Sequence, residues 1–351
     1  MLKKINLLGC SLESLERFFS EIGESMFRAK QLMNWIHQKG VIDFNSMTNF
    51  NKSLREKLKE IAIIEPPKII EEHISEEGTI KYLVEIESGS MVEMVVIPEK
   101  NRRTLCVSSQ AGCALQCTFC ATGAQGFDQD LKSSEIVGQL WLANFHAKDS
   151  KPITNIVFMG MGEPLLNYSE VKKAVMILMN DKGLDFSRRR ITLSTAGVVP
   201  LIKKAHDELG CMIAISLHAT DDKTRNILVP LNKKWPIDAI IKTLKDDLKL
   251  RNSERITFEY VMLKDVNDTE FDAKRLVKII QGLPSKINLI PFNKWVGSGY
   301  ERSPQKKIQA FSQIIKKAGF PSPVRAPRGE DIMAACGQLK SSTLKKRLNN
   351  A

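Results

Sequence analysis

The fold is decided by the stretch Thr104-Leu105-Cys106-Val107-Ser108-Ser109-Gln110-Ala111-Gly112-Cys113-Ala114-Leu115-Gln116-Cys117-Thr118-Phe119-Cys120. Residues 104–108 are predicted to form a strand, and three cysteines with the spacing C-x-x-x-C-x-x-C follow on a loop. From this stretch onward the chain alternates strand, loop and helix. Such alternation predicts an α/β fold in which helices surround a parallel sheet.

Six strand–helix units can be marked in this part of the chain. The predicted strands cover residues 104–108, 153–159, 191–194, 212–217, 256–262 and 287–291. The clearest helical patterns cover residues 134–146, 169–179, 237–248, 271–281 and 305–317. Six units predict a partial (β/α)6 barrel, whose chemistry should gather at the carboxyl ends of the strands. Residues 324–339, rich in Gly, Pro and charge, are predicted to form a loop.

Two smaller regions precede the barrel. Helical patterns cover residues 11–19, 28–38 and 52–61, and alternating strands at 81–86 and 91–97 flank a Gly-containing turn, which is a hairpin signal. We therefore divide the chain into an N-terminal helical accessory domain (1–65), a short β-hairpin connector (66–98), the barrel core (99–331) and a C-terminal segment (332–351).

The charge balance bears on the kind of partner. The chain has 351 residues and a formal net charge of +12, with basic clusters that include Arg188-Arg189-Arg190 and Lys345-Lys346-Arg347. This surplus indicates either a solubilising surface or a polyanionic partner, because neutralised phosphates release counterions. The arginine cluster directly precedes a predicted strand, so it is the better candidate for phosphate contact. Charge alone does not separate RNA from DNA or anionic lipid.

The hydrophobic pattern and the cysteines bear on location and chemistry. No apolar run approaches the ~20 residues of a membrane span, and the basic, briefly apolar N-terminus is too short for a secretory signal. We therefore expect a cytoplasmic protein with no membrane partner. Seven cysteines in a reducing compartment do not predict a disulfide scaffold. Four of them fall within residues 106–120, which indicates metal or redox chemistry.

The cysteine triplet could hold one soft metal centre. Zinc is one candidate, but a closed zinc site needs a fourth Cys or His at short spacing, and none lies nearby in the sequence. A 4Fe–4S cluster held by Cys113, Cys117 and Cys120 keeps one iron open for a substrate, and we favour it. A zinc-stabilised RNA-binding protein without catalysis stays as an alternative.

The triplet also carries a resemblance. The pattern C-x-x-x-C-x-aromatic-C after the first barrel strand resembles the radical S-adenosylmethionine (SAM) superfamily, and Gly160-Met161-Gly162-Glu163-Pro164 after the second strand resembles its Gly-Gly-Glu-type segment. The resemblance implies that SAM chelates the open iron through its amine and carboxylate. One electron from the cluster then yields a 5′-deoxyadenosyl radical.

Further segments narrow the resemblance to one family. Residues 91–93, 106–113, 162–167, 216–219, 289–293 and 334–339 resemble the RlmN family of RNA methyltransferases, which modify C2 of adenosine. The resemblance implies two RNA substrates: an adenosine of 23S rRNA near the peptidyl-transferase centre and the adenosine 3′ of the anticodon in tRNA. It also implies a reductant such as flavodoxin, and we expect a monomer.

The resemblance assigns three catalytic roles. Cys336 accepts a methyl group from one SAM, and a second SAM supplies the radical that activates it, so each turnover uses two. The resulting methylene radical adds to C2, Glu93 accepts the C2 proton, and Cys106 resolves the adduct through a transient Cys106–Cys336 disulfide. Without the resemblance, Cys336 reads as a free thiol, Cys106 as a small buried strand residue, and Glu93 as a residue on the solvated face of its strand.

The same resemblance predicts the residues that contact SAM. They lie at or just after strand ends: Gly162, Glu163, Ser194, Ser216, Leu217, His218 and Asn293. His218 also reads as a satisfied core histidine.

Two other enzyme classes remain as alternatives. Methyltransferases of the Cfr type act on C8 of a ribosomal adenosine and share the cysteine motifs, although residues 162–167 and 289–293 are more similar to RlmN. A radical enzyme that acts on a protein or small molecule is disfavoured by the net charge and by the Cys106–Cys336 pair.

Overall fold

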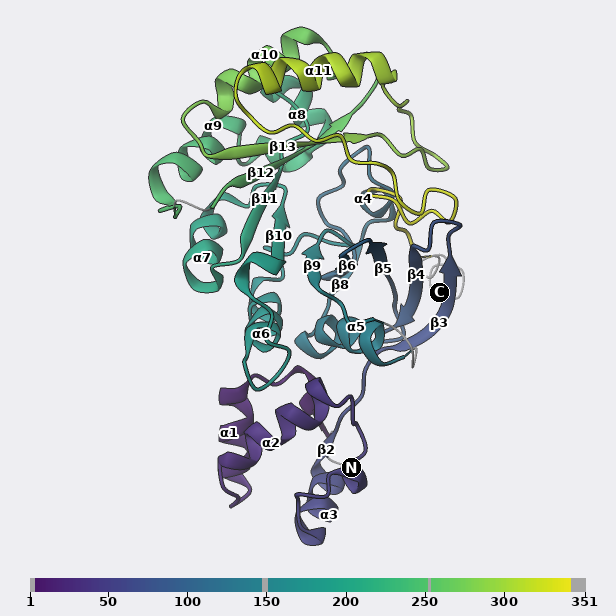
Figure 1. The fold of residues 1–351 in the computed structure, drawn as a ribbon, viewed down its shortest axis with the longest axis vertical. Helices are drawn as coiled ribbons and strands as arrows, with labels where there is room; N and C mark the ends of the chain where they lie inside the picture. Colours follow the sequence, from purple (N-terminus) through teal and green to yellow (C-terminus); the bar gives the residue numbers. More distant parts are fainter. Residues whose placement is uncertain (1–3, 147–150, 252–253, 342–351) are drawn as a thin grey trace.

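The computed structural model describes residues 4–146, 151–251 and 254–341. Its centre is a nine-stranded sheet with the order β13-β12-β11-β10-β9-β6-β5-β4-β3. Six neighbouring strands are parallel: β6 (Arg102–Cys106), β9 (Asn155–Phe158), β10 (Ile191–Thr195), β11 (Met212–Ser216), β12 (Ile256–Met262) and β13 (Ser285–Pro291). Helices cover the outside of these strands (Figure 1), which confirms the predicted partial barrel.

The barrel helices are α5 (Ser133–Phe145), α6 (Tyr168–Met179), α7 (Val199–Leu209), α8 (Asp222–Leu228), α9 (Ile237–Lys242), α10 (Glu270–Ile280) and α11 (Gln305–Lys317). Five of the barrel helices follow the predicted patterns with small shifts, and α7 and α8 were not among those patterns. The wider helical turn η6 (Thr243–Asp247) continues α9. All seven residues of β12 are buried, which is typical of a parallel strand covered on both faces. Both faces of β12 are therefore covered, and the face that points into the barrel can line a site.

The predicted hairpin is part of a larger antiparallel extension of the same sheet. β5 (Met91–Glu99) pairs with β6, β4 (Ile80–Glu85) pairs with β5, and β3 (Lys68–Ile74) forms the edge. β3 was not predicted because it is mostly exposed and carries Glu71-Glu72-His73 where an apolar alternation would be expected. β3 forms because it pairs with β4, and such a pairing between strands cannot be read from sequence periodicity.

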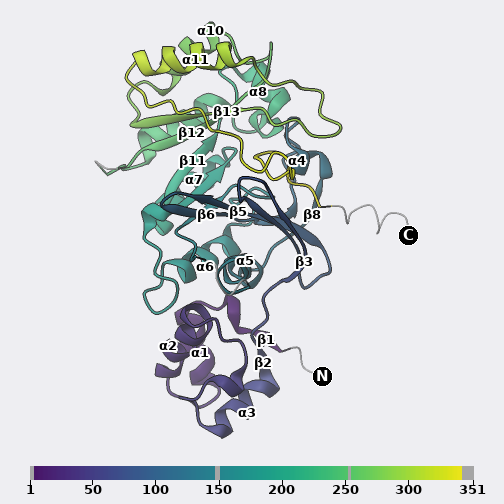
Figure 2. The same cartoon turned by 45° about the vertical axis from the view of Figure 1, so that its right-hand side comes forward.

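The N-terminal region is helical, as predicted. It contains α1 (Leu12–Glu21), α2 (Phe27–Met33) continued by η2 (Asn34–Gln38), and α3 (Lys52–Ile61), with short strands β1 (Ile5–Asn6) and β2 (Ala62–Ile63). The Ser11 and Asn51 side chains cap α1 and α3. The turn η1 (Leu7–Gly9) packs on α5, where Ser133 Oγ donates to the Gly9 carbonyl at 2.9 Å. Both views place these helices below α5 and α6, away from the cysteine loop (Figure 2).

The C-terminal segment closes the open side of the barrel. Residue 324 forms a parallel bridge with Leu289 of β13. The chain then crosses to the other edge of the open barrel, where Arg328 pairs with Glu77 at 2.9 Å and the Lys340 amide donates to Glu93 Oε2 at 2.8 Å. Residues 342–351 of the predicted C-terminal segment, including Lys345-Lys346-Arg347, lie outside the described residues.

None of the helices in the described ranges combines the length and apolar character needed to cross a membrane.

Candidate functional site

Two cavities meet inside the barrel. The smaller, which we call the cluster cavity, has a volume of about 160 Å³ and is lined by the three motif cysteines and the loops after β9, β10 and β11. The larger, which we call the barrel cavity, has a volume of about 550 Å³ and follows the inward faces of the barrel strands. The chemistry predicted from the sequence is therefore divided between two compartments.

The cysteine loop is held in place by short strands and close backbone contacts. Cys113 follows β7 (Gln110–Gly112), which pairs with β8 (Phe127–Asp130), and Cys120 precedes α4 (Ala121–Gln125). Gly112 has φ +73°, and a Cβ there would lie 1.9 Å from the Gly126 carbonyl oxygen. Only glycine allows this approach, so Gly112 fixes where Cys113 points.

The donor set fits an iron–sulfur cluster better than a single metal ion. Within the described residues, no three His, Cys, Asp or Glu side chains converge closely enough to hold one ion. A 4Fe–4S cluster offers a separate iron to each thiolate, so its ligands need only border one space. Cys113, Cys117 and Cys120 all line the cluster cavity. Burial raises the pKa of the Cys113 thiol to about 12, so a positive centre is needed to keep these sulfurs ionised.

A buried arginine beneath the cysteine loop was missed by sequence reasoning. Arg225 of α8 is fully buried, and its Nη2 donates to the carbonyl oxygens of Ala196 (2.6 Å) and Ser216 (3.0 Å). It thereby ties the ends of β10 and β11 together and places a positive charge near Cys117. In the sequence it lies within a polar helix, and no local signal marks it as buried.

Five of the seven predicted SAM contacts line the cluster cavity: Gly162, Glu163, Ser194, Ser216 and His218. The Glu163 carboxylate accepts hydrogen bonds from the backbone amides of Ala196 (2.8 Å) and Leu165 (3.1 Å). Burial raises its pKa to about 7. Glu163 therefore joins the loops after β9 and β10, in addition to lining the cavity.

His218 fits both interpretations made from the sequence, a residue of the cofactor site and a hydrogen-bonded core histidine. Its Nδ1 accepts the Val261 amide at 3.1 Å, and its ring meets Phe119 edge-on at 4.7 Å. Burial lowers its pKa to about 3, so the imidazole is neutral. It is a satisfied core histidine that also borders the cluster cavity.

The other two predicted SAM contacts lie elsewhere. Leu217 is fully buried and is not among the described residues that line either cavity. Asn293 lines the barrel cavity, and its Nδ2 donates to the Cys336 carbonyl at 3.1 Å. Asn293 therefore holds the loop that carries Cys336.

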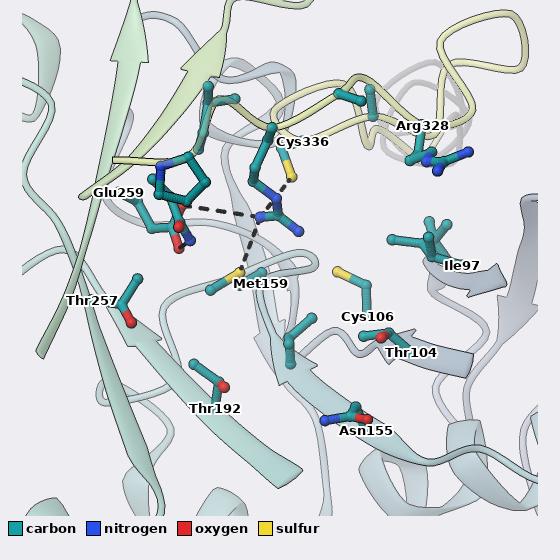
Figure 3. Close-up of a pocket in the computed structure, with 18 of the residues that line it drawn as sticks. Ile97, Thr104, Cys106, Asn155, Met159, Thr192, Thr257, Glu259, Arg328 and Cys336 are labelled. Carbon is teal, nitrogen blue, oxygen red and sulfur yellow. Dashed lines mark hydrogen bonds and ion pairs between the residues drawn. The ribbon is translucent and has the colours of Figure 1, made fainter. Parts of the chain in front are cut away.

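The two predicted redox cysteines share the barrel cavity (Figure 3). Cys106 is buried at the end of β6, whereas Cys336 is exposed on the C-terminal segment, and both are free thiols. Burial, then the neighbouring Cys336, raises the pKa of Cys106 to about 12. Two cysteines that lie far apart in the sequence are thus brought to one cavity.

Cys336 lies on the wall between the two cavities. Five residues line both of them: Met159, Glu259, Ile290, Arg325 and Cys336. Arg325 Nη1 lies 3.8 Å from Cys336 Sγ and 3.9 Å from Met159 Sδ. Neither Arg325 nor Glu259 was selected from the sequence. Arg325 has no local signal, whereas Glu259 is the one charged residue of the predicted strand 256–262, and that signal could have found it.

Glu93 is buried, and the prediction of a solvated face is wrong in this respect. It is 5% exposed, its Oε1 pairs with Lys81 at 3.1 Å, and its Oε2 accepts the Lys340 amide. Burial raises its pKa, and Lys81 opposes this. Glu93 is not among the described residues that line either cavity. It lies behind the segment that carries Cys336.

The barrel cavity has a basic border at the amino ends of the strands. Its lining there includes Arg102, Arg189, Arg190 and Lys286, with Arg102 paired to Glu99. Arg188, the first residue of the predicted phosphate-contact cluster, instead lies beside Gly210. The basic cluster is therefore divided, and only its last two residues reach the cavity.

Comparison with known proteins agrees with this geometry. Residues 5–64 match the family described as ribosomal RNA large subunit methyltransferase N-terminal domain, and residues 107–274 match the radical SAM superfamily. The dual-specificity RNA methyltransferase RlmN of Jannaschia sp. (strain CCS1) is 51% identical over 98% of this chain and 91% of its own length. The RlmN of Dinoroseobacter shibae is 50% identical over 99% of this chain and 92% of its own length.

A solved structure is also similar over the whole fold. The crystal structure of a radical SAM methyltransferase from Sphaerobacter thermophilus has a TM-score of 0.90 and 38% identity, covering 96% of this chain and 99% of that one. Fold, domain content and sequence therefore agree. The chain belongs to the RlmN family of dual-specificity RNA methyltransferases, within the radical SAM superfamily.

Proposed function

We propose that this chain forms 2-methyladenosine in RNA, both in the peptidyl-transferase region of 23S rRNA and in tRNA 3′ of the anticodon. The observation that carries the proposal is the position of Cys336 on the wall between two cavities. A residue that accepts a methyl group from one partner and passes it to another needs access to both. The relatives named RlmN are dual-specificity RNA methyltransferases, which supports RNA as the substrate, and the motif resemblance implies the adenosine target.

The cluster cavity is proposed to hold the cofactors. Cys113, Cys117 and Cys120 would bind the 4Fe–4S cluster, and Gly162, Glu163, Ser194, Ser216 and His218 would contact SAM. When bound, these groups supply methyl groups and the one-electron chemistry that removes hydrogen from an unreactive methyl group. We expect two SAM molecules per turnover and an external reductant such as flavodoxin.

The chain's own residues would carry the methyl group through the barrel cavity. Cys336 accepts it as a thioether, and its methylene carbon then bonds to C2 of the adenine. Glu93 accepts the C2 proton, which requires the 334–340 segment to shift, because the Lys340 amide now occupies Glu93 Oε2. Cys106 finally attacks the Cys336 sulfur, which forms the disulfide and breaks the sulfur–carbon bond. The bonding electron pair goes to the carbon, which takes up a proton and becomes the methyl group, and the surplus electron of the radical addition would return to the cluster.

Leu217 and Asn293 remain proposed SAM contacts, and the structure gives each of them a second part. Asn293 holds the Cys336 loop through the Cys336 carbonyl, so we assign it to loop positioning. Leu217 contributes its backbone, whose carbonyl accepts Arg225 Nε at 2.9 Å. Family membership also argues against the zinc-stabilised, non-catalytic alternative.

The test is an anaerobic reaction of the reconstituted protein with SAM, a reductant and protein-free ribosomal RNA, followed by digestion and mass spectrometry. We expect 2-methyladenosine with the wild type and none with Cys336→Ala. Appearance of 8-methyladenosine would replace the proposal with the Cfr-type activity. Accumulation of 5′-deoxyadenosine without any methylated base would retain the radical chemistry and reject the RNA substrate.

A further inference from the structure

Glu259 is a buried acid that the proposed reaction does not use. It lies in the middle of β12, is 3% exposed, and lines both cavities. Figure 3 shows it near Met159 at the Cys336 end of the barrel cavity, with Thr192 and Thr257 farther along the same cavity. An acid inside a barrel has to be explained, because burying a carboxylate is costly.

The hydrogen bonds of Glu259 are incomplete. Its Oε1 accepts from Asn288 Nδ2 at 2.8 Å, and Asn288 is its register partner on β13. Its Oε2 is buried and has no hydrogen-bond donor among the described residues. The nearest cation, Arg325 Nη1, is 4.0 Å from this oxygen, which is beyond hydrogen-bond distance. One oxygen is therefore fixed by Asn288, and the other is buried and lacks a hydrogen-bond donor, which a ligand can supply when the side chains around it shift.

The position of this oxygen limits what the ligand can be. Arg325 Nη1 lies 4.0 Å from Glu259 Oε2 and 3.8 Å from Cys336 Sγ. Both atoms thus flank one guanidinium nitrogen, and a single planar base in the barrel cavity can reach both. Burial raises the pKa of Glu259, and Arg325 and the Asn288 amide oppose this. As a carboxylate, Glu259 can only accept hydrogen bonds.

We propose that Glu259, oriented by Asn288, accepts a hydrogen bond from the exocyclic amino group of the target adenine and thereby selects adenosine. The inference rests on the proposed function, since it takes an adenine as the ligand of the barrel cavity. The amino group is the donor on the pairing edge of adenine, whereas hypoxanthine has a carbonyl oxygen at that position. A carboxylate attracts the first base and repels the second.

The experiment compares RNA hairpins that differ only at the target base: adenosine, inosine, or purine riboside, which lacks the amino group. Wild-type enzyme should methylate adenosine at least about tenfold faster, in kcat/KM, than either analogue. Glu259→Gln introduces an amide that can donate to the inosine carbonyl. It should lower the adenosine preference over inosine by about tenfold or more and methylate inosine faster than the wild type does. A gain of this kind cannot arise from misfolding.

The control is Tyr260→Phe, which removes a polar group from the neighbouring buried β12 residue, and Tyr260 is not among the described residues that line either cavity. Its base preference should equal that of the wild type. Equal rates of the wild type on adenosine and inosine would overturn the inference. So would a Glu259→Gln variant that has a raised KM for SAM and an unchanged base preference, because Glu259 would then serve the cofactor.

Failure of the proposed function is recognised separately, by a wild type that forms no methylated adenosine in any RNA. Equilibrium binding of the same hairpins needs no turnover and decides the inference in that case. Tighter binding of the adenosine hairpin to the wild type, lost in Glu259→Gln, would support it. Equal binding of all hairpins to both proteins would reject it.

Discussion

At the scale of single residues, Arg225 shows how a buried charge can organise a site. Its guanidinium donates to three carbonyl oxygens at the ends of β10 and β11, those of Ala196, Ser216 and Leu217, and to Asn232 Oδ1. Burial lowers its pKa to about 10, so it stays charged at neutral pH. A positive charge at this place would also offset the negative charge of the three thiolates that we propose bind a cluster.

Replacing Arg225 should therefore be costly. Arg225→Met leaves its buried acceptors without donors, and each unsatisfied group costs about 1–3 kcal/mol. We expect the melting temperature to fall by about 5 °C or more, measured by differential scanning calorimetry under anaerobic conditions, together with a lower iron content. The matched control is Lys223→Met on the exposed side of the same helix. Equal melting temperatures of the two variants would show that the Arg225 hydrogen bonds contribute nothing.

The site residues that could be predicted from the sequence are those whose roles follow from their spacing along a short stretch of chain. Cys113, Cys117 and Cys120 lie within eight consecutive positions, and Gly162 and Glu163 directly follow a strand. Arg225 and Arg325 could not be found in this way, because their roles arise from burial and from partners on other strands. Glu93 was selected by resemblance, but its burial depends on Lys81 and Lys340, which lie on separate segments.

At the scale of elements, the barrel strands could be predicted from local patterns, whereas the edge of the antiparallel extension β5-β4-β3 could not. β12 was predicted with its observed bounds because β-branched and aromatic residues make up most of it. β3 was missed because an exposed edge strand has no such pattern. Residues 324–339 were predicted to form a loop, and this segment does so. Its closure of the barrel depends on Glu77 and Glu93, which no local pattern could identify.

The turn η2 carries an element-scale prediction about pH. His37 is buried, and neither ring nitrogen has a hydrogen-bond partner among the described residues. Burial lowers its pKa from 6.5 to about 4. The folded state therefore binds fewer protons than the unfolded state between these values. The stabilisation is complete above pH 6.5 and is lost as the pH falls toward 4, by about 3 kcal/mol in total.

His37→Leu should remove this acid sensitivity. The melting temperature of the wild type should fall more between pH 7 and pH 4.5 than that of the variant, since carboxylates titrate in both proteins. His73→Leu, at an exposed position on β3 beside Glu71, is the control and should follow the wild type. Parallel curves for the wild type and His37→Leu would mean that His37 is not buried in its neutral form.

At the scale of the whole molecule, the two cavities lie toward opposite ends of the barrel strands. The cluster cavity lies at the carboxyl ends of the strands, beneath the cysteine loop. The barrel cavity extends toward the amino ends, where Arg189, Arg190 and Lys286 line it. In the proposed reaction, cofactor and RNA would therefore approach Cys336 from opposite sides. A net charge of +12 favours RNA in general, but only charges beside the barrel cavity can place a particular nucleotide there.

This arrangement predicts unequal effects from equal changes of charge. Arg189→Ala with Arg190→Ala removes two charges beside the cavity, and Lys316→Ala with Lys317→Ala removes two exposed charges from the end of α11. If two phosphates are contacted, the first variant should lower the slope of log K against log salt by about 1.4–1.8, because each contact accounts for about 0.7–0.9. The second should leave the slope nearly unchanged. Fluorescence anisotropy of an anticodon stem-loop RNA at several salt concentrations measures both. Identical slopes for the two variants would mean that the positive charge acts as a diffuse field and that RNA does not enter at the amino ends of the strands.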